Sequence, residues 1–410
     1  MTQSWCQKLV IVSDSGSHRL EPTVHQNIST DNRVPPSNRN TPLKVDILLP
    51  VKERFTPKNA GAISGVVPDL VMASRSGTQF TIFGHPVERP FDDVAFTGLA
   101  PRRRWLHGRN IGFAAAYLDS LQNRITPDLV EVHSRGQVAA YLLKKRPDLR
   151  VLLYFHNDPR EMLGTQTAAE RTALLARLAG VICVSDYIRS CYLDGLDIDQ
   201  KTAAKVGVAR NGAVRWLNEQ PKKDPIILLA GRMVPEKGIL ECTQALAKLL
   251  PDFPDWRLII AGARRFEDAR PGSYEAKIAE VIKPLGNQAS MLGFIPLEEV
   301  RQWQARAAIS ACPSIWHDPM PKAVLESLAA GCALLTTRRG GIPEAAEGRA
   351  HILDDVSITG FLAGFRQLLN DDDYRQRLQD SAWLDFPFTD DVMANMADQC
   401  RQKAVDSALS

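Results

Sequence analysis

Short apolar runs alternate with helical stretches along most of this chain. The first run is KVDILLPV, starting at Lys44, and it is followed by QFTIFG, LVEVHS, VLLYFHN and GVICVS. Amphipathic stretches such as QVAAYLLKKR separate most of these runs. Strands that are apolar throughout and alternate with helices indicate a parallel sheet covered on both faces. The pattern therefore predicts an α/β fold.

A second series of the same kind starts after the polar stretch NEQPKKDP, which is typical of a linker. It runs through IILLAG, RLIIAGA, ASMLGF, ISACPS and ALLTT, with helical stretches between most of these runs. We therefore expect two Rossmann-like domains with parallel sheets, at residues 44–220 and 221–385. Residues 386–410 are expected to form a last helix, capped by Thr389 and crossing back to the first domain.

The beginning of the chain lacks this alternation. Residues 1–43 are rich in Ser, Asn, Thr, Pro and Arg, and they end in NISTDNRVPPSNRNTP. Because so little of this segment can be buried, we expect a flexible N-terminal extension there.

Length and composition agree with a globular protein of two domains. A chain of 410 residues exceeds what one ordinary hydrophobic core holds. Hydrophobic residues make up 44% of the chain and charged residues 24%, which is typical of a globular protein. The net charge of +3 is nearly balanced, so overall charge gives no reason to expect a nucleic-acid partner.

Cysteine usage and hydropathy indicate the compartment. The seven cysteines are scattered without a C-x-x-C pair, which favours a reducing compartment over a disulfide framework. No apolar run approaches the roughly 18 residues that a membrane-spanning helix needs, and the N-terminus shows no signal-peptide pattern. We therefore expect a cytoplasmic protein that can also work at the inner face of a membrane.

Candidate chemistry appears first in the stretch LLAGRMVPEKGILE, where a strand passes into a helix. Arg232 and Lys237 lie in this connection, beside the free N–H groups of the helix start. A guanidinium grips two oxygens in a fork and an ammonium adds a point charge, so the two cations suit a diphosphate. The alternative is a solvated turn that carries incidental charge.

The segment PSIWHDPMPKAVLESLAAG continues a second strand into a helix of small residues. Pro321 suits the first position of this helix, which is expected to end at Gly331. Its apolar face leaves Glu326 above small neighbours, where a carboxylate can accept two hydrogen bonds from a ribose diol. Alternatively, Glu326 is exposed and pairs with Lys322 at four-residue spacing, which contributes only about 0.3 kcal/mol.

Two histidines lie at the ends of apolar runs. His156 ends VLLYFHN, and the carboxyl end of a parallel strand is where ligands of such folds bind. A lone histidine is more often structural, so both interpretations stay open. His133 has the same placement in VEVHSRG, but nothing else in the sequence converges on it.

Two charged stretches give weaker signals. The residues DID at 197–199 resemble an acidic metal motif, but they lie in a polar connection, and no metal site is expected. The cluster PRRRWLHGR contains Arg102, Arg103, Arg104 and Trp105. Such a run is usually only solvated, but an aromatic residue within it also suits a membrane surface or a phosphorylated acceptor.

Taken in order, several motifs resemble those of retaining glycosyltransferases of family 4, which have the GT-B fold. They are NAGAISG, RNGA, GRMVPEKG, LGFIP, PSIWHDPMPKAVLESLAAG and GGIPE. The resemblance covers nearly all of residues 44–405. It implies two Rossmann-like domains whose parallel sheets face each other across an interdomain cleft.

The resemblance also implies roles for individual residues. The catalytic set comprises His156, Arg232, Lys237 and Asp318. The donor-binding set comprises Gly61, Asn211, Gly231, Arg232, Lys237, Phe294, Ile295, Met320, Pro321, Lys322 and Glu326. Residues 102–105 are expected to face the acceptor or a membrane surface, and no metal or other cofactor is implied.

Two positions depart from the family pattern. The first acid of the acid–seven–acid motif is usually Glu, and the shorter Asp318 stands there. The loop usually reads Pro-Phe-Gly after this acid, but here Pro321 replaces the glycine and donates no N–H. Neighbours such as Lys322 are then expected to complete that part of the donor site.

The implied activity is the transfer of a hexose-type sugar with retention of its anomeric configuration. The donor is expected to be a nucleotide-diphosphate sugar, with a UDP-sugar favoured and GDP-mannose next. The acceptor is expected to be a glycan or a lipid-linked molecule in surface polysaccharide or lipopolysaccharide biosynthesis. The alternatives are a nucleotide-sugar epimerase of the same fold and a catalytically weak sugar-nucleotide-binding protein.

Overall fold

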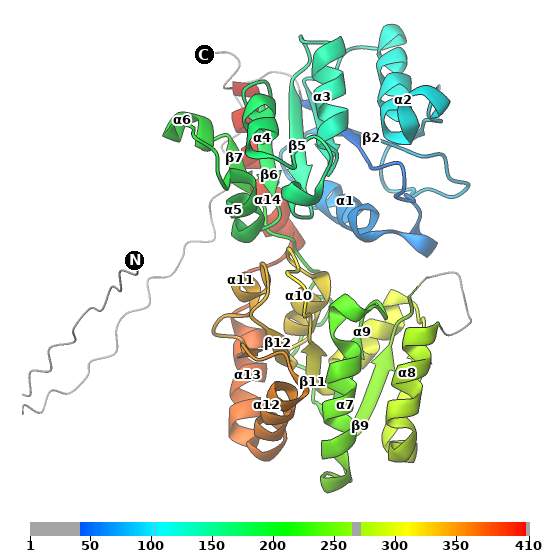
Figure 1. Ribbon diagram of the computed structural model, residues 1–410, viewed down its shortest axis with the longest axis vertical. Helices are drawn as coiled ribbons and strands as arrows, with labels where there is room; N and C mark the ends of the chain where they lie inside the picture. The colour runs from blue at the N-terminus through cyan, green and yellow to red at the C-terminus, as the bar shows by residue number, and fades with distance from the viewer. Residues whose placement is uncertain (1–41, 103, 265–271, 407–410) are drawn as a thin grey trace, which may run out of the picture. The chain divides into compact units, whose positions relative to one another are not determined.

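The computed structural model describes residues 42–102, 104–264 and 272–406. The predicted flexible extension at residues 1–43 lies almost wholly outside these residues. Two parallel β-sheets with flanking helices account for most of what is described (Figure 1). The predicted α/β class, with two Rossmann-like sheets, is confirmed.

The first sheet has seven strands in the order β3-β2-β1-β4-β5-β6-β7, and all neighbours pair in parallel. The strands are β1 (Lys44–Leu48), β2 (Gln79–Gly84), β3 (Phe96–Gly98), β4 (Leu129–His133), β5 (Val151–Phe155), β6 (Gly180–Cys183) and β7 (Val206–Val208). Every residue of β4 and β5 is buried, as expected of central strands covered on both faces.

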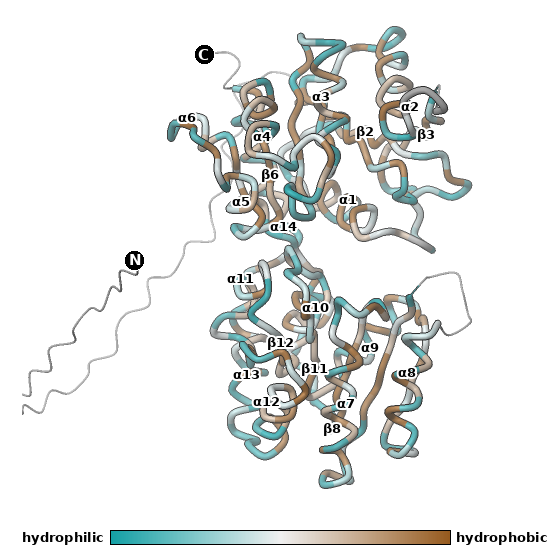
Figure 2. Tube along the Cα trace, in the orientation of Figure 1, coloured by the Kyte–Doolittle hydropathy of each residue, from teal (hydrophilic) through white to brown (hydrophobic). Residues whose placement is uncertain are grey.

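The second sheet has six strands in the order β10-β9-β8-β11-β12-β13, again paired in parallel throughout. Its strands are β8 (Asp224–Ala230), β9 (Arg257–Ala261), β10 (Ala289–Gly293), β11 (Ala307–Cys312), β12 (Ala333–Thr337) and β13 (Ala350–Leu353). In Figure 2, hydrophobic positions concentrate along the strands and along one side of many helices.

Helices connect successive strands in both halves. Those of the first half are α1 (Ala62–Met72), α2 (Arg104–Ser120), α3 (Gly136–Lys145), α4 (Ala168–Leu175), α5 (Asp186–Leu193) and α6 (Gln200–Ala203). Those that follow are α7 (Ile239–Leu249), α8 (Ser273–Ile282), α9 (Leu297–Arg306), α10 (Lys322–Ala329), α11 (Ile342–Ala346), α12 (Ile358–Asn370), α13 (Asp372–Leu384) and α14 (Asp390–Asp406). Short 3₁₀ turns lie at Pro57–Asn59, Leu121–Asn123, Pro159–Glu161, Pro235–Lys237, Leu250–Asp252 and Lys283–Gln288.

Two helix ends bear on the sequence predictions. The hydroxyl of Thr389 accepts a hydrogen bond of 3.3 Å from the backbone N–H of Val392, so the predicted cap of α14 is confirmed. Pro321 directly precedes α10 instead of occupying its first position, and the helix ends at Ala329. The backbone of Pro321 is extended, with φ −71° and ψ 129°, which explains the shift by one residue.

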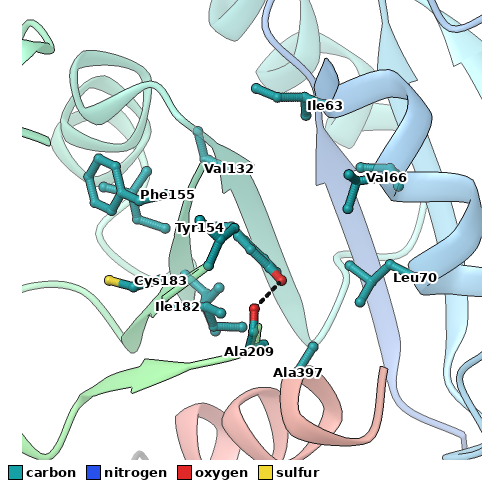
Figure 3. Close-up of a cluster of buried hydrophobic side chains, with 14 of the residues drawn as sticks. Ile63, Val66, Leu70, Val132, Tyr154, Phe155, Ile182, Cys183, Ala209 and Ala397 are labelled. Atoms are coloured by element: carbon teal, nitrogen blue, oxygen red, sulfur yellow. Dashed lines mark hydrogen bonds between the residues drawn. The ribbon is translucent and has the colours of Figure 1, made fainter. Parts of the chain in front are cut away.

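The helix α14, although last in sequence, packs on the first sheet beside β6, β7 and α1. Figure 3 shows Ile63, Val66 and Leu70 of α1 and Ala397 of α14 around Tyr154 of β5. All of these side chains are buried, and the Tyr154 hydroxyl donates to the backbone oxygen of Ala209 over 3.4 Å. The C-terminal helix therefore completes the hydrophobic core of the first sheet.

Each sheet reverses its strand order next to its first strand. In the first sheet the reversal lies between β1 and β4, and in the second between β8 and β11. The connections on either side of such a reversal leave the carboxyl edge in opposite directions, and ligands of open α/β sheets bind in the resulting crevice. Among the described residues, no helix is both long and apolar enough to cross a membrane.

Candidate active site

Four charged residues lie in the two connections at the reversal of the second sheet. Arg232 and Lys237 follow β8, and Asp318 and Glu326 follow β11. The two connections touch at Gly238, which has a left-handed backbone with φ 65°. A Cβ atom there would lie 2.1 Å from the backbone oxygen of Pro313, so only glycine allows this approach.

The two predicted cations differ in their surroundings. The Lys237 ammonium forms an ion pair with the carboxylate of Asp318, which is only 6% exposed. Arg232 is exposed, and no ion pair joins it to another described residue. One cation is therefore neutralised inside the protein, while the other is available to an anionic ligand.

The loop that carries Asp318 is held by the double glycine downstream. Gly341 donates its N–H to the backbone oxygen of Asp318 over 2.8 Å. A Cβ atom on Gly341 would lie 1.8 Å from the backbone oxygen of Pro319, and one on Gly340 would lie 2.2 Å from that of Asp318. The two glycines therefore allow close packing of two loops, which places the Asp318 carboxylate next to Lys237.

Glu326 lies on the first turns of α10 and is partly buried. Burial raises the pKa of its carboxyl group, against the opposing attraction of Lys322 and Arg301. The alternative interpretation, an exposed pair of Glu326 with Lys322, does not describe the structure. Lys322 instead forms an ion pair of 2.6 Å with Asp69 of α1.

Of the remaining donor-binding candidates, some are accessible to a ligand and others are buried. Phe294 and Ile295 follow β10, and the Phe294 ring is 46% exposed. Gly231 follows β8, and a Cβ atom there would meet open space. Asn211, in contrast, is buried and donates its side-chain N–H to the backbone oxygen of Met320 over 2.9 Å. Asn211 therefore supports the loop of Met320 and Pro321 directly.

At the carboxyl end of the first sheet, His156 follows β5 and His133 ends β4. Their ring nitrogens, Nδ1 of His133 and Nε2 of His156, lie 2.9 Å apart. Burial, followed by the neighbouring His133, lowers the pKa of His156 well below its usual value, so this ring is neutral at pH 7. The sequence expectation that nothing converges on His133 is wrong, because Glu131 also lies 2.9 Å from its other nitrogen.

Gly61 is the residue that precedes α1, and an internal carboxylate occupies this helix start. Glu53 accepts a hydrogen bond of 3.0 Å from the backbone N–H of Ser64. A Cβ atom on Gly61 would lie 2.2 Å from the same Glu53 oxygen. The helix start is thus close enough to an acidic group that Gly61 can carry no side chain without movement of Glu53.

A hollow of about 1080 Å³ lies beside this loop in the first half. Five basic side chains line its wall, together with His85 and the acids Glu53, Glu88 and Asp92. The basic residues are Lys52, Arg54, Lys58, Arg89 and Arg109. The excess of positive charge suits a ligand that carries an anionic group.

The predicted acceptor-facing cluster is only partly described. Arg102 is exposed and forms an ion pair with Asp119. Arg103 lies outside the described residues, and only the backbone of Arg104 and Trp105 is described, at the start of α2. Arg109 of α2, at the end of this basic run, lines the hollow.

The GGIPE motif makes a polar contact that was not predicted from the sequence. Glu344 of GGIPE accepts hydrogen bonds of 2.9 and 2.8 Å from the backbone N–H groups of Asp186 and Tyr187, at the start of α5. Arg210 donates to the same carboxylate over 3.2 Å. The motif therefore joins the second half to a helix start of the first, a partner that lies 158 residues away in sequence.

No group of three or more His, Cys, Asp or Glu side chains that could hold a metal ion occurs among the described residues.

Comparison with known proteins gives several sequence relatives. The Bacillus subtilis (strain 168) protein YtcC is 24% identical over 69% of this chain and 69% of its own length. Spore coat protein SA of the same strain is 25% identical over 61% of this chain and 71% of its own length. Lipopolysaccharide 1,2-N-acetylglucosaminetransferase of Salmonella typhimurium is 24% identical over 57% of this chain and 58% of its own length.

Solved structures share the architecture over nearly the whole chain. Sucrose-phosphate synthase from Thermosynechococcus elongatus has a TM-score of 0.70 at 16% identity, over 90% of this chain and 100% of that one. Anabaena HepE, solved with UDP and glucose, has a TM-score of 0.68 at 13% identity, over 88% and 99%. At these identities the likeness concerns the fold alone, and it confirms the GT-B prediction.

Two family models match consecutive parts of the sequence. The model described as Glycosyltransferase Family 4 matches residues 72–213, and the model described as Glycosyl transferases group 1 matches residues 213–383. Together they cover the whole second sheet, with the reversal where the charged residues lie, and all of the first sheet except β1. The chain belongs to the group 1 glycosyltransferases and is an enzyme that transfers glycosyl groups.

Proposed function

We propose that this enzyme transfers a hexose-type sugar from a nucleoside diphosphate sugar to a glycan or lipid-linked acceptor, with retention of the anomeric configuration. One observation carries the proposal. Arg232 and Lys237 follow one strand at the reversal of the second sheet, and Asp318 and Glu326 follow the other. Cations for a diphosphate and carboxylates for hydroxyl groups therefore come from adjacent connections at the edge where such ligands bind.

The two cations serve the leaving group. When the bond between sugar C1 and the diphosphate oxygen breaks, its electron pair stays on that oxygen. Arg232 and Lys237 stabilise the resulting charge without a bound metal ion, and about 3 kcal/mol from each corresponds to roughly 10² in rate. On donor binding, the Lys237 ammonium turns from Asp318 to the diphosphate, and the Asp318 carboxylate accepts hydrogen bonds from sugar hydroxyls.

Retention follows from attack on the face that the diphosphate leaves. The acceptor hydroxyl oxygen forms the new bond to C1 as the old bond breaks. Its proton passes to the departing phosphate oxygen, so atoms and charge balance without a covalent enzyme intermediate. His156 contacts the transferred sugar from the carboxyl end of the first sheet.

The nucleoside part of the donor uses the remaining candidates. The Glu326 carboxylate accepts hydrogen bonds from the ribose diol, while Phe294 and Ile295 line the base. Uracil is favoured as the base. Support comes from Anabaena HepE, a protein of the same fold that has been solved with UDP-glucose.

The acceptor binds in the hollow of the first half through an anionic group. The five basic side chains of its wall support this, since they outnumber the three acids. A biosynthetic role in surface polysaccharide or lipopolysaccharide is supported by the similarity to the Salmonella typhimurium transferase, which carries lipopolysaccharide in its name. Contact with a membrane surface belongs to the same proposal, because lipid-linked acceptors reside there.

A panel of UDP-, GDP- and ADP-sugars tests the proposal. A donor at a hundred times its dissociation constant stabilises the folded protein by about 2.7 kcal/mol, which a thermal-shift measurement detects. With an acceptor, NMR of the product is expected to show the anomeric configuration of the donor. Stabilisation by none of the sugars contradicts the proposal. Conversion of the donor without acceptor identifies an epimerase, and binding without turnover identifies a sugar-nucleotide-binding protein.

A further inference from the structure

A chain of buried polar groups leads from the C-terminal helix to His156. Arg401 of α14 and Glu131 of β4 are both fully buried. The guanidinium donates from Nε to Oε2 of Glu131 over 2.7 Å and from Nη2 to Oε1 over 2.9 Å. It also donates from Nη1 to Asp398 over 2.9 Å, and Asp398 accepts a further hydrogen bond of 2.7 Å from Ser74.

His133 connects this ion pair to His156. Glu131 and His133 are two residues apart on β4, so their side chains lie on the same face of the sheet. Nε2 of His133 lies 2.9 Å from Oε1 of Glu131, and Nδ1 lies 2.9 Å from Nε2 of His156. His133 is fully buried, whereas His156 is partly exposed at the end of β5.

Stacking holds the three rings in parallel. The ring centroids of Tyr154 and His133 lie 5.0 Å apart with planes inclined by 19°, and those of Tyr154 and His156 lie 4.8 Å apart at 10°. The imidazole of His156 is therefore fixed both by a neighbouring ring and by the hydrogen bond to His133. If the ion pair between Glu131 and Arg401 only stabilised the fold, it would require neither the stacking of these rings nor the hydrogen bond between His133 and His156.

The positions of the protons follow from the direction of each hydrogen bond. Burial alone would raise the pKa of Glu131, but Arg401 and the hydrogen bonds to it lower that pKa to about 2, so the group is a carboxylate that only accepts. The proton of His133 therefore sits on Nε2. A neutral ring then has a bare Nδ1, which must accept from Nε2–H of His156. This leaves Nδ1 of His156 without a proton.

Every hydrogen bond of the chain is satisfied when both rings are neutral. Both oxygens of Glu131 already accept from Arg401, so Glu131 needs only the one N–H of a neutral His133. The pKa of His156 is lowered well below its usual value, chiefly by burial. Asp398 of α14 also faces the chain, and Ser74 and Arg401 donate to its two oxygens. Burial raises the pKa of Tyr154 of β5 and that of Cys400 of α14, which is near Arg401 and Glu131.

We propose that Glu131 and His133 are positioning residues that hold His156 in the Nε2-protonated tautomer. The bare Nδ1 of His156 then accepts a hydrogen bond from a hydroxyl group of the transferred sugar. The role of the sugar contact rests on the proposed function, but the tautomer of His156 does not. A neutral imidazole with a fixed acceptor orients the sugar without adding positive charge next to the oxocarbenium-like centre.

NMR of the protein labelled with ¹⁵N-histidine tests the tautomer directly. The chain has eight histidines, and spectra of His156→Gln and His133→Gln assign the two signals of interest. In the wild-type protein we expect a protonated Nε2 and an unprotonated Nδ1 for both rings. Protonation of His156 at Nδ1, or an equal mixture of its tautomers, overturns the proposal whatever the enzyme's activity.

Two substitutions of His133 separate its two contacts. In His133→Asn the side-chain oxygen can replace Nδ1 as the acceptor for His156, whereas in His133→Gln the longer amide reaches Glu131 and leaves His156 without a partner. We expect kcat to fall about 10- to 100-fold in the glutamine variant, the loss that is typical when a group that orients a metal-bound histidine is removed. The asparagine variant is expected to stay within a few-fold of the wild type, and KM for the donor to change little in either.

Failure of this proposal can be told from failure of the proposed function. If His156→Ala keeps wild-type turnover, the sugar contact is wrong, and the spectra still decide the tautomer. If His156→Ala is inactive but the two His133 variants have equal kcat, the positioning role is wrong. Should neither His133 variant fold, the spectrum of the wild-type protein decides alone.

Discussion

At the scale of single residues, the two cations of the proposed donor site differ in their interactions within the protein. Lys237 is the partner of the nearly buried Asp318, so it neutralises a carboxylate before any ligand arrives. Arg232 is exposed and is joined by no ion pair to the rest of the described chain. We therefore expect a substitution at Lys237 to affect both the stability of the fold and catalysis, and one at Arg232 to affect only the proposed interaction with the ligand.

Alanine substitutions test this difference. We expect Arg232→Ala and Lys237→Ala each to lower kcat about 10²-fold, the usual loss for one group that stabilises a developing anion. Only Lys237→Ala should also lower the free energy of unfolding, by about 1–3 kcal/mol, because it leaves a buried carboxylate unpaired. Steady-state kinetics and urea unfolding measure the two effects.

Arg306→Ala provides the matched control for this pair. Arg306 is exposed and pairs with Asp224 at the opposite end of β8, so both kcat and stability should stay near wild type. Wild-type kcat in Arg232→Ala would rule out the proposed contact with the diphosphate.

The residues also show what the sequence could and could not reveal. The spacing of Glu131 and His133 on one strand indicated a shared face, and this signal was available before the structure. Arg401, the partner of Glu131, lies 270 residues away and could not be inferred from any local pattern. In the same way, Lys237 and Asp318 were each placed in the site by motif, but their ion pair depends on contact between two connections.

At the scale of elements, the loop after β11 depends on glycine. Gly341→Ala would place a methyl group 1.8 Å from the backbone oxygen of Pro319, so one of the two loops must move. We expect this variant to fold but to bind the donor at least 10-fold more weakly, because Asp318 shifts from the position in which it is proposed to accept hydrogen bonds from the sugar hydroxyls. Fluorescence or calorimetric titration with UDP-glucose measures the affinity. An unchanged affinity would show that the loop contact does not position the donor site.

At the start of α14, the carboxyl group of Asp390 lowers the stability of the folded protein. One carboxyl oxygen of Asp390 is buried with no hydrogen-bond partner in the described part of the chain. Burial raises its pKa from 3.8 to about 6, against the opposing attraction of Lys322. A carboxyl group that holds its proton more tightly when folded destabilises the protein progressively as the pH rises from about 4 to about 6.

Asp390→Asn should remove this loss. We expect the free energy of unfolding at pH 8 to rise by about 1–2 kcal/mol, after allowance for partial exposure to solvent. At pH 4 both proteins carry a neutral side chain there, so the difference should nearly vanish. Urea unfolding at the two pH values measures both quantities. An equal difference at pH 4 and pH 8 would show that ionisation of Asp390 is not its cause.

The elements themselves were largely predictable from sequence. Apolar runs such as VLLYF and IILLA became central strands, because both faces of a parallel sheet exclude water. The predicted ends of α10 were less accurate, because Pro321 keeps an extended backbone and lies just outside the helix. No role was predicted for Gly340 and Gly341, since the close approach of two loops has no signature in local sequence.

At the scale of the whole molecule, two parallel sheets share one topological rule. Each reverses its strand order beside its first strand, and each reversal has polar side chains in the following connections. The second sheet contributes the cations and carboxylates of the proposed donor site, and the first contributes His156 and the basic hollow. This division was visible in the sequence as two series of strands. The hydrogen bonds that Glu344 accepts from the start of α5, which connect the two series, were not visible in the sequence.

The central claim is that a nucleoside diphosphate binds at the reversal between β8 and β11. Titration calorimetry with UDP, GDP and ADP, into the wild-type protein and into Arg232→Ala and Glu326→Ala, tests it most directly. We expect one of the three nucleotides to bind the wild type. Each substitution should weaken that binding about 10- to 100-fold, because a charge-assisted hydrogen bond contributes about 1.5–3 kcal/mol. Equal affinity in all three proteins, or no binding of any nucleotide to the wild type, would contradict the claim.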